Sequence, residues 1–316
     1  MTTETENKTD LSTAAPGGSD VVVIYHKGCS DGFCAAWLLH KLYPDATFLP
    51  KHPGMLLLTG EAEGKHVIVA DLSFSPNTTL WILEKAKSFL CLDHHRTAAE
   101  RLDGIPGCHF DENKSGARMV WEYFGELRDH FGGRPDLPWL VAYTEDRDLW
   151  RWKLPLSRQV NAALQCFDFD FKVWDRLGLT TSPVGSLNPY AIVTSGDEEY
   201  DGHTLVDYHA KKVAAAASRA IEVEVPIEDE STLVVPCVNI ANSDHTSDVG
   251  EALAKSHESQ IGLTYYHDGY GFRFSIRSVG DADAGRIAEF NGGGGHKHAA
   301  GFFRKHFLPV FESEYQ

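Results

Sequence analysis

Three apolar runs in the first third of the chain each end in polar, chemically versatile side chains. The runs cover residues 21–25, 66–70 and 88–92 and are rich in Val, Ile and Leu. Continuous runs of this kind are typical of parallel strands buried on both faces of a sheet. Parallel strands place their carboxyl ends at one edge, where α/β sheets bind ligands, so the side chains there should converge. Those side chains are His26, Asp31, Asp71, Asp93, His94 and His95.

Helical patterns separate and follow these runs. Apolar positions at helical spacing, with capping residues before them, predict helices over residues 33–42, 77–87, 117–131, a stretch from Pro138, and an alanine-rich connecting helix over 203–221. Beyond Pro226 the pattern changes to short strands near residues 233–236, 261–266 and 271–278, with a helix near 247–257. In the last strand Arg273, Ser275 and Arg277 share one face, because side chains alternate along a strand.

Composition limits the class of protein. A chain of 316 residues that is 42% hydrophobic favours two domains with buried cores. The first twenty residues carry neither a basic segment nor an apolar core, so they are interpreted as a disordered tail rather than a secretion signal. No apolar run approaches the length of a membrane span, so a soluble protein is expected.

The net charge and the cysteine content indicate the cellular compartment and limit the classes of binding partner. Six cysteines without a Cys-x-x-Cys pair indicate a reducing, cytoplasmic compartment. A net charge of −16 argues against attraction to long duplex nucleic acid or to an anionic membrane. A phosphate substrate would therefore have to be captured locally, by metal ions, single arginines and backbone amides.

Three stretches carry candidate chemistry, and each has a simpler alternative. Asp93, His94 and His95 form either a solvated loop with incidental histidines or ligands that satisfy one another around a divalent cation. A further acidic stretch contains Asp146, and Asp148 beyond it is interpreted as an ion pair with Arg147 or as another site candidate.

Glycine dominates the third stretch. Residues 292–295 are either a flexible linker or a backbone that approaches a phosphate closely, assisted by a helix predicted to begin near His296. The Arg277 strand and the apolar residues after the glycines favour the second interpretation.

Taken together, these motifs resemble the DHH superfamily of metal-dependent phosphoesterases, in the branch with a C-terminal DHHA1 domain. The resemblance rests on motifs in the same order over nearly the whole chain beyond the tail: residues 26–32, Asp71, Asp93-His94-His95, Asp146, and residues 292–301 with Arg277. It implies an α/β fold, with a parallel-sheet catalytic domain, a smaller mixed α/β domain, and an active site in the cleft between them. The expected divisions are a tail (1–19), the catalytic domain (20–165), a linker with a helix (166–229) and the substrate-binding domain (230–316).

The resemblance also implies roles for individual residues. One metal would be held by His26, Cys29 and Asp71, and the other by Asp31, a bridging Asp71, His94 and Asp146. His95 would face the phosphate, and Asp93 would orient its neighbouring histidine. Substrate would be bound by Arg277, Gly293, Gly294, Gly295 and His296.

Two positions depart from the family pattern. Cys29 stands at or near an aspartate position of the first motif, and a thiolate suits Zn²⁺ better than Mn²⁺. His298 stands where the family usually has a small or apolar residue.

The expected function is hydrolysis of phosphoester bonds in short nucleotides or oligonucleotides, with two Mn²⁺ ions, or with Mg²⁺ or another divalent metal in their place. The alternatives are a nucleotide-binding protein with weakened catalysis, and a phosphatase acting on 3′-phosphoadenosine phosphate or polyphosphate. The sequence is compatible with a monomer or a homodimer.

Overall fold

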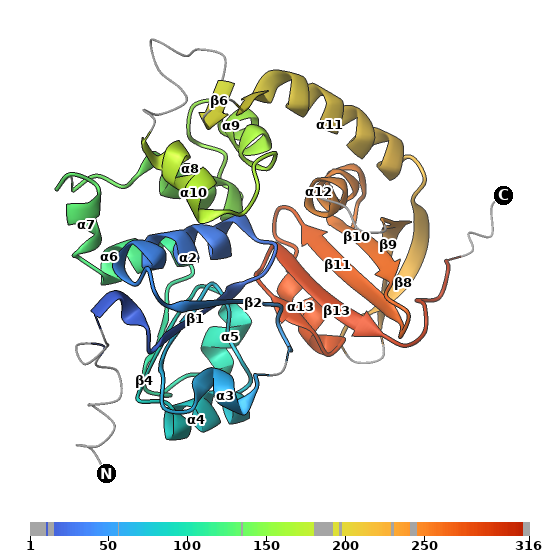
Figure 1. Ribbon diagram of the computed structural model, residues 1–316. Coiled ribbons are helices and arrows are strands. Elements are labelled where there is room, and N and C mark those ends of the chain that lie inside the picture. Colours follow the sequence, from blue (N-terminus) through green and yellow to red (C-terminus); the bar gives the residue numbers. More distant parts are fainter. Residues whose placement is uncertain are drawn as a thin grey trace. The chain divides into compact units, whose positions relative to one another are not determined.

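The computed structural model describes residue 11 and residues 16–55, 57–133, 135–179, 192–195, 198–228, 231–240 and 245–311. Most of the predicted N-terminal tail (1–19) lies outside the described residues, which include residue 11 and residues 16–19 of it. The chain divides into two compact units, Met1–Val206 and Asp207–Gln316. Each unit is built around its own sheet (Figure 1).

Unit 1 alternates strands and helices over most of its length. In chain order its elements are η2 (Pro16–Gly18), β1 (Val21–His26), α2 (Ser30–Leu42), β2 (Thr47–Lys51), α3 (Thr59–Ala62), β3 (His66–Ala70), α4 (Pro76–Lys85), β4 (Ser88–Asp93), α5 (Arg96–Arg101), β5 (Cys108–Phe110), α6 (Gly116–Tyr123), α7 (Leu127–His130), α8 (Trp139–Asp148), α9 (Ser157–Leu164), α10 (Phe171–Leu179), β6 (Ile192–Ser195) and β7 (Glu198–Asp201).

The central sheet of unit 1 is parallel throughout, with strand order β2-β1-β3-β4-β5. Its two faces are both buried, which explains why the strands are continuously apolar rather than alternating. Alternate residues face different cores: Val23 and Ile68 pack on the side that includes α2 and α6, whereas Val22 and Val67 pack on the side of α4. The parallel α/β architecture expected from the sequence is confirmed.

The strand order places a topological switch point at the carboxyl ends of β1 and β3. The connections from β1 run to β2 on one side and onward to β3 on the other, and such a switch point is where doubly wound sheets bind ligands. Gly32, in the first turn of α2, lets this helix approach the end of β1 closely. A Cβ atom at Gly32 would lie 2.5 Å from the carbonyl oxygen of His26. The tight strand-to-helix connection therefore depends on glycine.

Unit 2 contains a mixed sheet of order β12-β13-β11-β10-β9-β8. The helix α11 (Gly202–Ala217) runs from unit 1 into unit 2, and the remaining elements are β8 (Ile221–Pro226), β9 (Thr232–Asn239), α12 (Thr246–Ser256), β10 (Ile261–His267), β11 (Phe272–Ser278), α13 (Ala284–Phe290), β12 (Gly294–Gly295) and β13 (Ala299–Arg304). Phe274 and Ile276 of β11 are buried in the core with α13, whereas Arg277, on the opposite strand face, lies against Gly250 of α12. Arg273, Ser275 and Arg277 thus share a face, as predicted.

One predicted helix is wrong. The sequence analysis expected a helix to begin near His296, but residues 299–304 form the strand β13, which pairs with β11 and with β12. Gly293 explains the hairpin, because a Cβ atom there would lie 2.0 Å from the carbonyl oxygen of Gly301. Gly295 has φ of 144°, which other residues avoid. The glycine run therefore makes a close β-hairpin rather than the approach to a helix.

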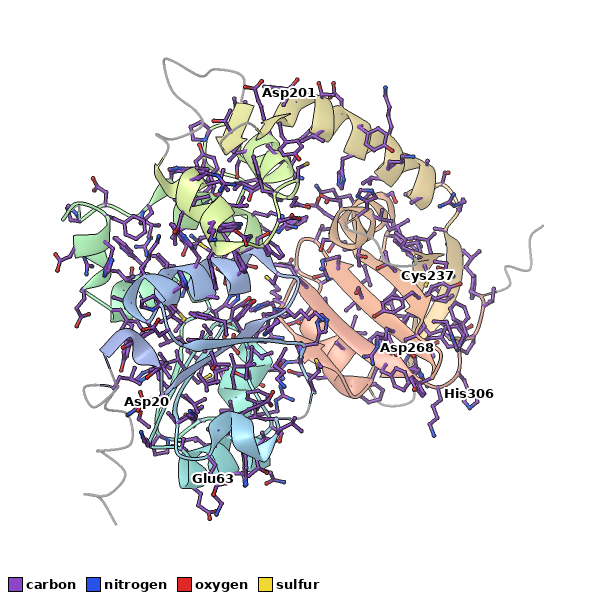
Figure 2. All side chains as sticks on the ribbon, in the orientation of Figure 1. Asp20, Glu63, Asp201, Cys237, Asp268 and His306 are labelled. Atoms are coloured by element: carbon purple, nitrogen blue, oxygen red, sulfur yellow. The ribbon has the colours of Figure 1, made fainter. Side chains whose placement is uncertain are left out.

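Acidic side chains contribute to the surface of both units. Exposed carboxylates such as Glu63 and Asp201 project from the periphery of unit 1 (Figure 2). Among the described residues, none of the helices has both the length and the apolar character needed to cross a bilayer.

Candidate metal centre

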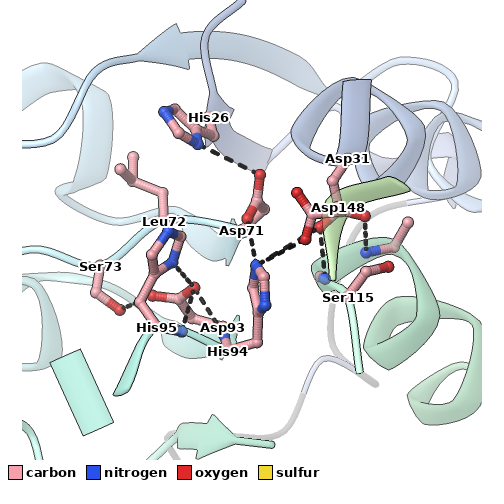
Figure 3. Close-up of polar contacts among 12 residues, drawn as sticks. His26, Asp31, Asp71, Leu72, Ser73, Asp93, His94, His95, Ser115 and Asp148 are labelled. Atoms are coloured by element: carbon pink, nitrogen blue, oxygen red, sulfur yellow. Dashed lines mark hydrogen bonds and ion pairs between the residues drawn. The ribbon is translucent and has the colours of Figure 1, made fainter. Parts of the chain in front are cut away.

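Three neighbouring strands deliver polar side chains to one edge of the unit 1 sheet (Figure 3). His26 is the last residue of β1, Asp71 follows directly after β3, and Asp93 is the last residue of β4. The backbone N–H of Asp71 donates to the carbonyl oxygen of Leu92, which ties the end of β3 to β4. Asp71 has φ of 54°, a left-handed conformation that aspartate tolerates better than most residues.

Asp71 lies at the middle of the cluster. Its Oδ2 is 3.4 Å from Nδ1 of His26, and its Oδ1 is 3.1 Å from Nε2 of His94. The carboxylate is 1% exposed, so its charge is almost completely shielded from water. One aspartate thus faces two imidazoles on two sides, the arrangement expected of a bridging ligand.

Asp31 and Asp148 complete the side of the cluster around His94. Nε2 of His94 lies 3.3 Å from Oδ2 of Asp148 and 4.0 Å from Oδ2 of Asp31. Asp31 also accepts hydrogen bonds from the first backbone N–H groups of α6, at 2.6 Å from Gly116 and 3.0 Å from Ala117. These N–H groups have no partner within their own helix, so they hold the Asp31 carboxylate in place.

The structure does not bring Asp146 into the cluster, which corrects the predicted ligand set. Its two carboxylate oxygens accept hydrogen bonds from the backbone N–H groups of Lys153 at 2.9 Å and Leu154 at 3.1 Å. Asp148 stands in its place. Residues two apart on an α-helix point about 200° apart, so only one of the pair can face the strand ends. The acidic stretch was visible in the sequence, but the side of the helix was not.

His95 is oriented by Asp93. Nδ1 of His95 lies 2.7 Å from Oδ1 of Asp93, which also accepts a bond from the backbone N–H of His94 at 2.8 Å. Oδ2 of Asp93 accepts a bond from the hydroxyl of Ser73 at 2.5 Å. Because both Asp93 oxygens have protein partners, Asp93 acts as an orienting group. The sequence analysis gave no role to Ser73, whose only signal was its position two residues after Asp71.

Cys29 lies beside His26 and Asp71. Ligand atoms of the three residues all lie within 4.8 Å of one another. Cys29 is the residue directly before α2, so the same loop that follows β1 presents both His26 and Cys29. Burial raises the pKa of the Cys29 thiol well above its usual value, and the nearby carboxylate of Asp71 raises it further. A cation at this position would favour the thiolate.

The negative charges of the carboxylates in this cluster are not fully neutralised by neighbouring side chains. Burial raises the pKa of Asp31 well above its usual range, and Asp71 and Asp148 raise it further. Burial by itself would also raise the pKa of Asp71, but the adjacent imidazoles of His26 and His94 outweigh it and hold the pKa well below normal. Burial likewise raises the pKa of Asp148. Three neighbouring carboxylates, of which Asp31 and Asp71 are buried and Asp148 is partly buried, require added positive charge, either protons or cations.

The donor set fits divalent cations. Among the described residues, Oδ2 of Asp71 and Oδ2 of Asp148 are buried and make no hydrogen bond, and their contacts with His26 at 3.4 Å and His94 at 3.3 Å are ion pairs. Two groups of possible ligands are adjacent: His26, Cys29 and Asp71, and then Asp31, His94 and Asp148. Carboxylates and imidazoles of this kind suit Mn²⁺ and related metals, and the thiol adds affinity for softer ones.

The predicted substrate residues lie in unit 2, where each has a structural partner. Arg277 donates to the hydroxyl of Ser247 at 2.6 Å and to the carbonyl oxygen of Ile276 at 2.9 Å. Gly294 and Gly295 form β12, and the backbone N–H of His296 bonds to the carbonyl oxygen of Ala299. His298 Nδ1 lies 3.0 Å from the hydroxyl of Ser278. These contacts define the hairpin but leave substrate binding as a prediction.

Comparisons with known proteins give one sequence relative and several structures. No family model matches the sequence. An uncharacterized protein, R106, of Acanthamoeba polyphaga mimivirus is 26% identical over 307 residues, which cover 89% of this chain. This chain spans 66% of that relative's length.

Among solved structures, the DHH domain of a member of a ribosomal-protein family has a TM-score of 0.50 and 13% identity. That alignment covers 94% of this chain and 84% of the other. Exonuclease RecJ bound to manganese has a TM-score of 0.46 and 16% identity, with 95% and 88% of the two chains covered. At such low identities the likeness concerns architecture. With its parallel sheet and its second mixed sheet, this chain has a fold similar to that of this DHH domain.

Proposed function

We propose that this protein is a metal-dependent phosphoesterase that hydrolyses short nucleotides or oligonucleotides. The observation that carries the proposal is the shared position of Asp71, between a His26–Cys29 group and an Asp31–His94–Asp148 group. Two divalent cations bound there would activate a water and neutralise charge that develops on a phosphoryl group.

The chain's own residues hold the side chains of the candidate site in position. Asp93 accepts a bond from Nδ1 of His95, so the opposite nitrogen of that ring is directed away from Asp93 and, when the ring is doubly protonated, donates to a phosphoryl oxygen. Asp31 is fixed by the N-terminus of α6, which keeps its carboxylate at the site. Asp146 holds the backbone after α8 and thereby positions Asp148.

The substrate class follows from charge. A net charge of −16 disfavours long polyanions, so a short substrate gripped at one or two phosphates is favoured. Arg277 and the glycine hairpin of unit 2 are the proposed contacts for the part of the substrate away from the scissile bond. The proposal includes Mn²⁺ as the cation and a cytoplasmic location, supported by six cysteines without a disulfide.

The test is hydrolysis of bis-p-nitrophenyl phosphate with Mn²⁺, Mg²⁺ or Zn²⁺ and with EDTA, followed by a panel of short oligonucleotides, cyclic dinucleotides and phosphoadenosine phosphate. Asp71→Asn should abolish metal-dependent hydrolysis, because a neutral amide cannot bridge two cations. Asparagine also tolerates the left-handed backbone at this position, so the fold should survive. Asp103→Asn, which changes an exposed carboxylate of unit 1, is the matched control and should keep full activity.

Two results would contradict the proposal. Near-normal turnover and metal content in Asp71→Asn would remove the bridging role. Nucleotide binding without hydrolysis of any substrate under any metal would instead support a binding protein whose catalysis is weakened at Cys29.

A further inference from the structure

Two cysteines outside the candidate metal centre lie side by side on adjacent parallel strands. Cys91 of β4 and Cys108 of β5 are register partners, and Cys108 packs against the core cluster that contains Cys91. Adjacent strands lie about 4.8 Å apart, within the Cα separation of roughly 4.4–6.8 Å that a disulfide spans. Cys91 is 2% exposed and Cys108 is partly exposed, so only one of the pair meets solvent.

The Cys91 sulfur is connected to the candidate active site through one hydroxyl. Sγ of Cys91 lies 3.7 Å from Oγ of Ser73 and 3.5 Å from the carbonyl oxygen of Leu72. The Ser73 hydroxyl donates to Asp93, and Asp93 holds His95 (Figure 3). A movement of the sulfur would therefore act on the contact that fixes the Asp93 carboxylate.

We propose that Cys91 and Cys108 form a reversible disulfide when the protein meets hydrogen peroxide, and that this bond shifts Ser73 and thereby loosens the hold of Asp93 on His95. The two sulfurs must approach to about 2.05 Å, so the Cys91 sulfur has to leave its present contacts with Ser73 and Leu72. The effect on hydrolysis rests on the proposed function, whereas disulfide formation does not.

The chemistry balances with peroxide as the oxidant. The Cys108 thiolate attacks one peroxide oxygen and the O–O bond breaks. The leaving hydroxide takes up the proton that the Cys108 thiol lost, so the products are a sulfenic acid and water. The Cys91 sulfur then attacks Cys108, the new S–S bond replaces the S–O bond, and a second water leaves with the Cys91 proton. Two electrons pass from the thiols to peroxide. The neighbouring Cys91 thiol lowers the pKa of Cys108, which agrees with Cys108 as the first nucleophile.

Trypsin separates the two cysteines, which makes the link directly measurable. Cleavage after Lys87, Arg96, Arg101 and Lys114 releases Cys91 on residues 88–96 and Cys108 on residues 102–114. After treatment with peroxide, alkylation of free thiols and digestion, mass spectrometry should show these two peptides joined, and dithiothreitol should separate them. Cys108→Ser should lose the joined species, and Cys166→Ser, which changes another partly exposed cysteine, should keep it.

Activity measured on the same samples tests the connection to His95. Metal-loaded wild type and Cys166→Ser should lose turnover on oxidation and regain it with dithiothreitol, while Cys108→Ser should keep the turnover of its untreated form. Absence of the joined peptide, or Cys108 found only as sulfinic acid, would overturn the disulfide. A joined peptide with unchanged turnover would overturn the coupling through Ser73. Absence of hydrolysis in the reduced protein would count against the proposed function and leave the peptide result intact.

Discussion

Asp146 and Asp148 lie in one turn of α8 but make different contacts. Asp146 binds two backbone N–H groups of the segment that follows the helix, whereas Asp148 faces His94. The first contact stabilises a loop, and the second places a partly buried negative charge beside Asp31 and Asp71. Substitution should therefore separate a structural carboxylate from a functional one.

We expect Asp146→Ala to lower stability and Asp148→Asn to lower metal binding. Removing the Asp146 acceptor leaves two N–H groups unsatisfied, at a cost of roughly 1–3 kcal/mol for each group that stays buried. Asp148→Asn removes charge from a repulsive cluster, so the unfolding midpoint of the metal-free protein should stay the same or rise. Urea unfolding and Mn²⁺ titration of both variants measure the difference. If Asp146→Ala lowered metal binding and Asp148→Asn lowered stability, Asp146 would be the metal ligand instead.

Cys29 is the residue where the ligand chemistry departs from oxygen and nitrogen donors. If its thiolate binds a cation, the site formed with His26 and Asp71 should prefer Zn²⁺ or Fe²⁺ to Mn²⁺. Cys29→Asp should raise Mn²⁺ content and Mn²⁺-supported turnover, because it restores a hard oxygen donor. Cys29→Ser should lower total metal content. If elemental analysis finds equal metal content in the wild type and both variants, Cys29 fills space in the structure and does not bind a metal.

At the scale of elements, the site depends on how closely α6 approaches β3. A Cβ atom on Gly116 would lie 2.7 Å from Cβ of Asp71 and 3.0 Å from Oδ2 of Asp31. The same residue donates the 2.6 Å hydrogen bond to Asp31. Glycine is thus required both for space and for the position of a donor, although nothing in the sequence around Ser115 indicated it.

Gly116→Ala should push α6 away from Asp71 and weaken metal binding. Overpacking of this kind costs typically about 1–3 kcal/mol, and the displaced N–H should also loosen Asp31. Gly60→Ala is the matched control, since Gly60 also lies in the first turn of a helix and its added Cβ would meet no atom within 4 Å. Thermal unfolding with and without Mn²⁺ gives both readouts. Equal behaviour of the two variants would mean that α6 adjusts freely.

At the scale of the whole molecule, the chain combines a parallel unit that carries the candidate metal ligands with a mixed unit that carries Arg277. The division falls between Val206 and Asp207, inside α11. The proposed division of labour assigns the reaction to unit 1 and recognition of the rest of the substrate to unit 2. It predicts different effects on small and large substrates.

Arg277→Ala should reduce hydrolysis of nucleotides far more than hydrolysis of a small chromogenic ester. Loss of a charge-assisted hydrogen bond costs about 1.5–3 kcal/mol, on the order of tenfold to over a hundredfold in kcat/KM for the nucleotide. Arg273→Ala is the matched control, because Arg273 lies on the same face of β11 and its side chain is paired with Asp268 at the surface. Equal losses on both substrates in Arg277→Ala would indicate a structural role against α12.

Much of unit 1 could be predicted from the sequence because its signals are local. The buried strands β1, β3 and β4 are continuously apolar, and the polar residues at their ends mark one edge of a parallel sheet. The convergence of His26, Asp71 and His94 follows from that geometry and is found. The short strand β2 and the helix α13 were not predicted, since their patterns are short and weakly periodic.

The sequence by itself determined the parallel architecture, the edge at which ligands gather and the types of donor available there. Tertiary structure decided which of Asp146 and Asp148 faces that edge, because the rotation of a helix about its axis is set by packing. It also decided that residues 292–301 form a hairpin, since β11 supplies the hydrogen bonds of β13. The contacts of Gly116 and the pairing of Cys91 with Cys108 join residues distant in sequence, so only the folded chain reveals them.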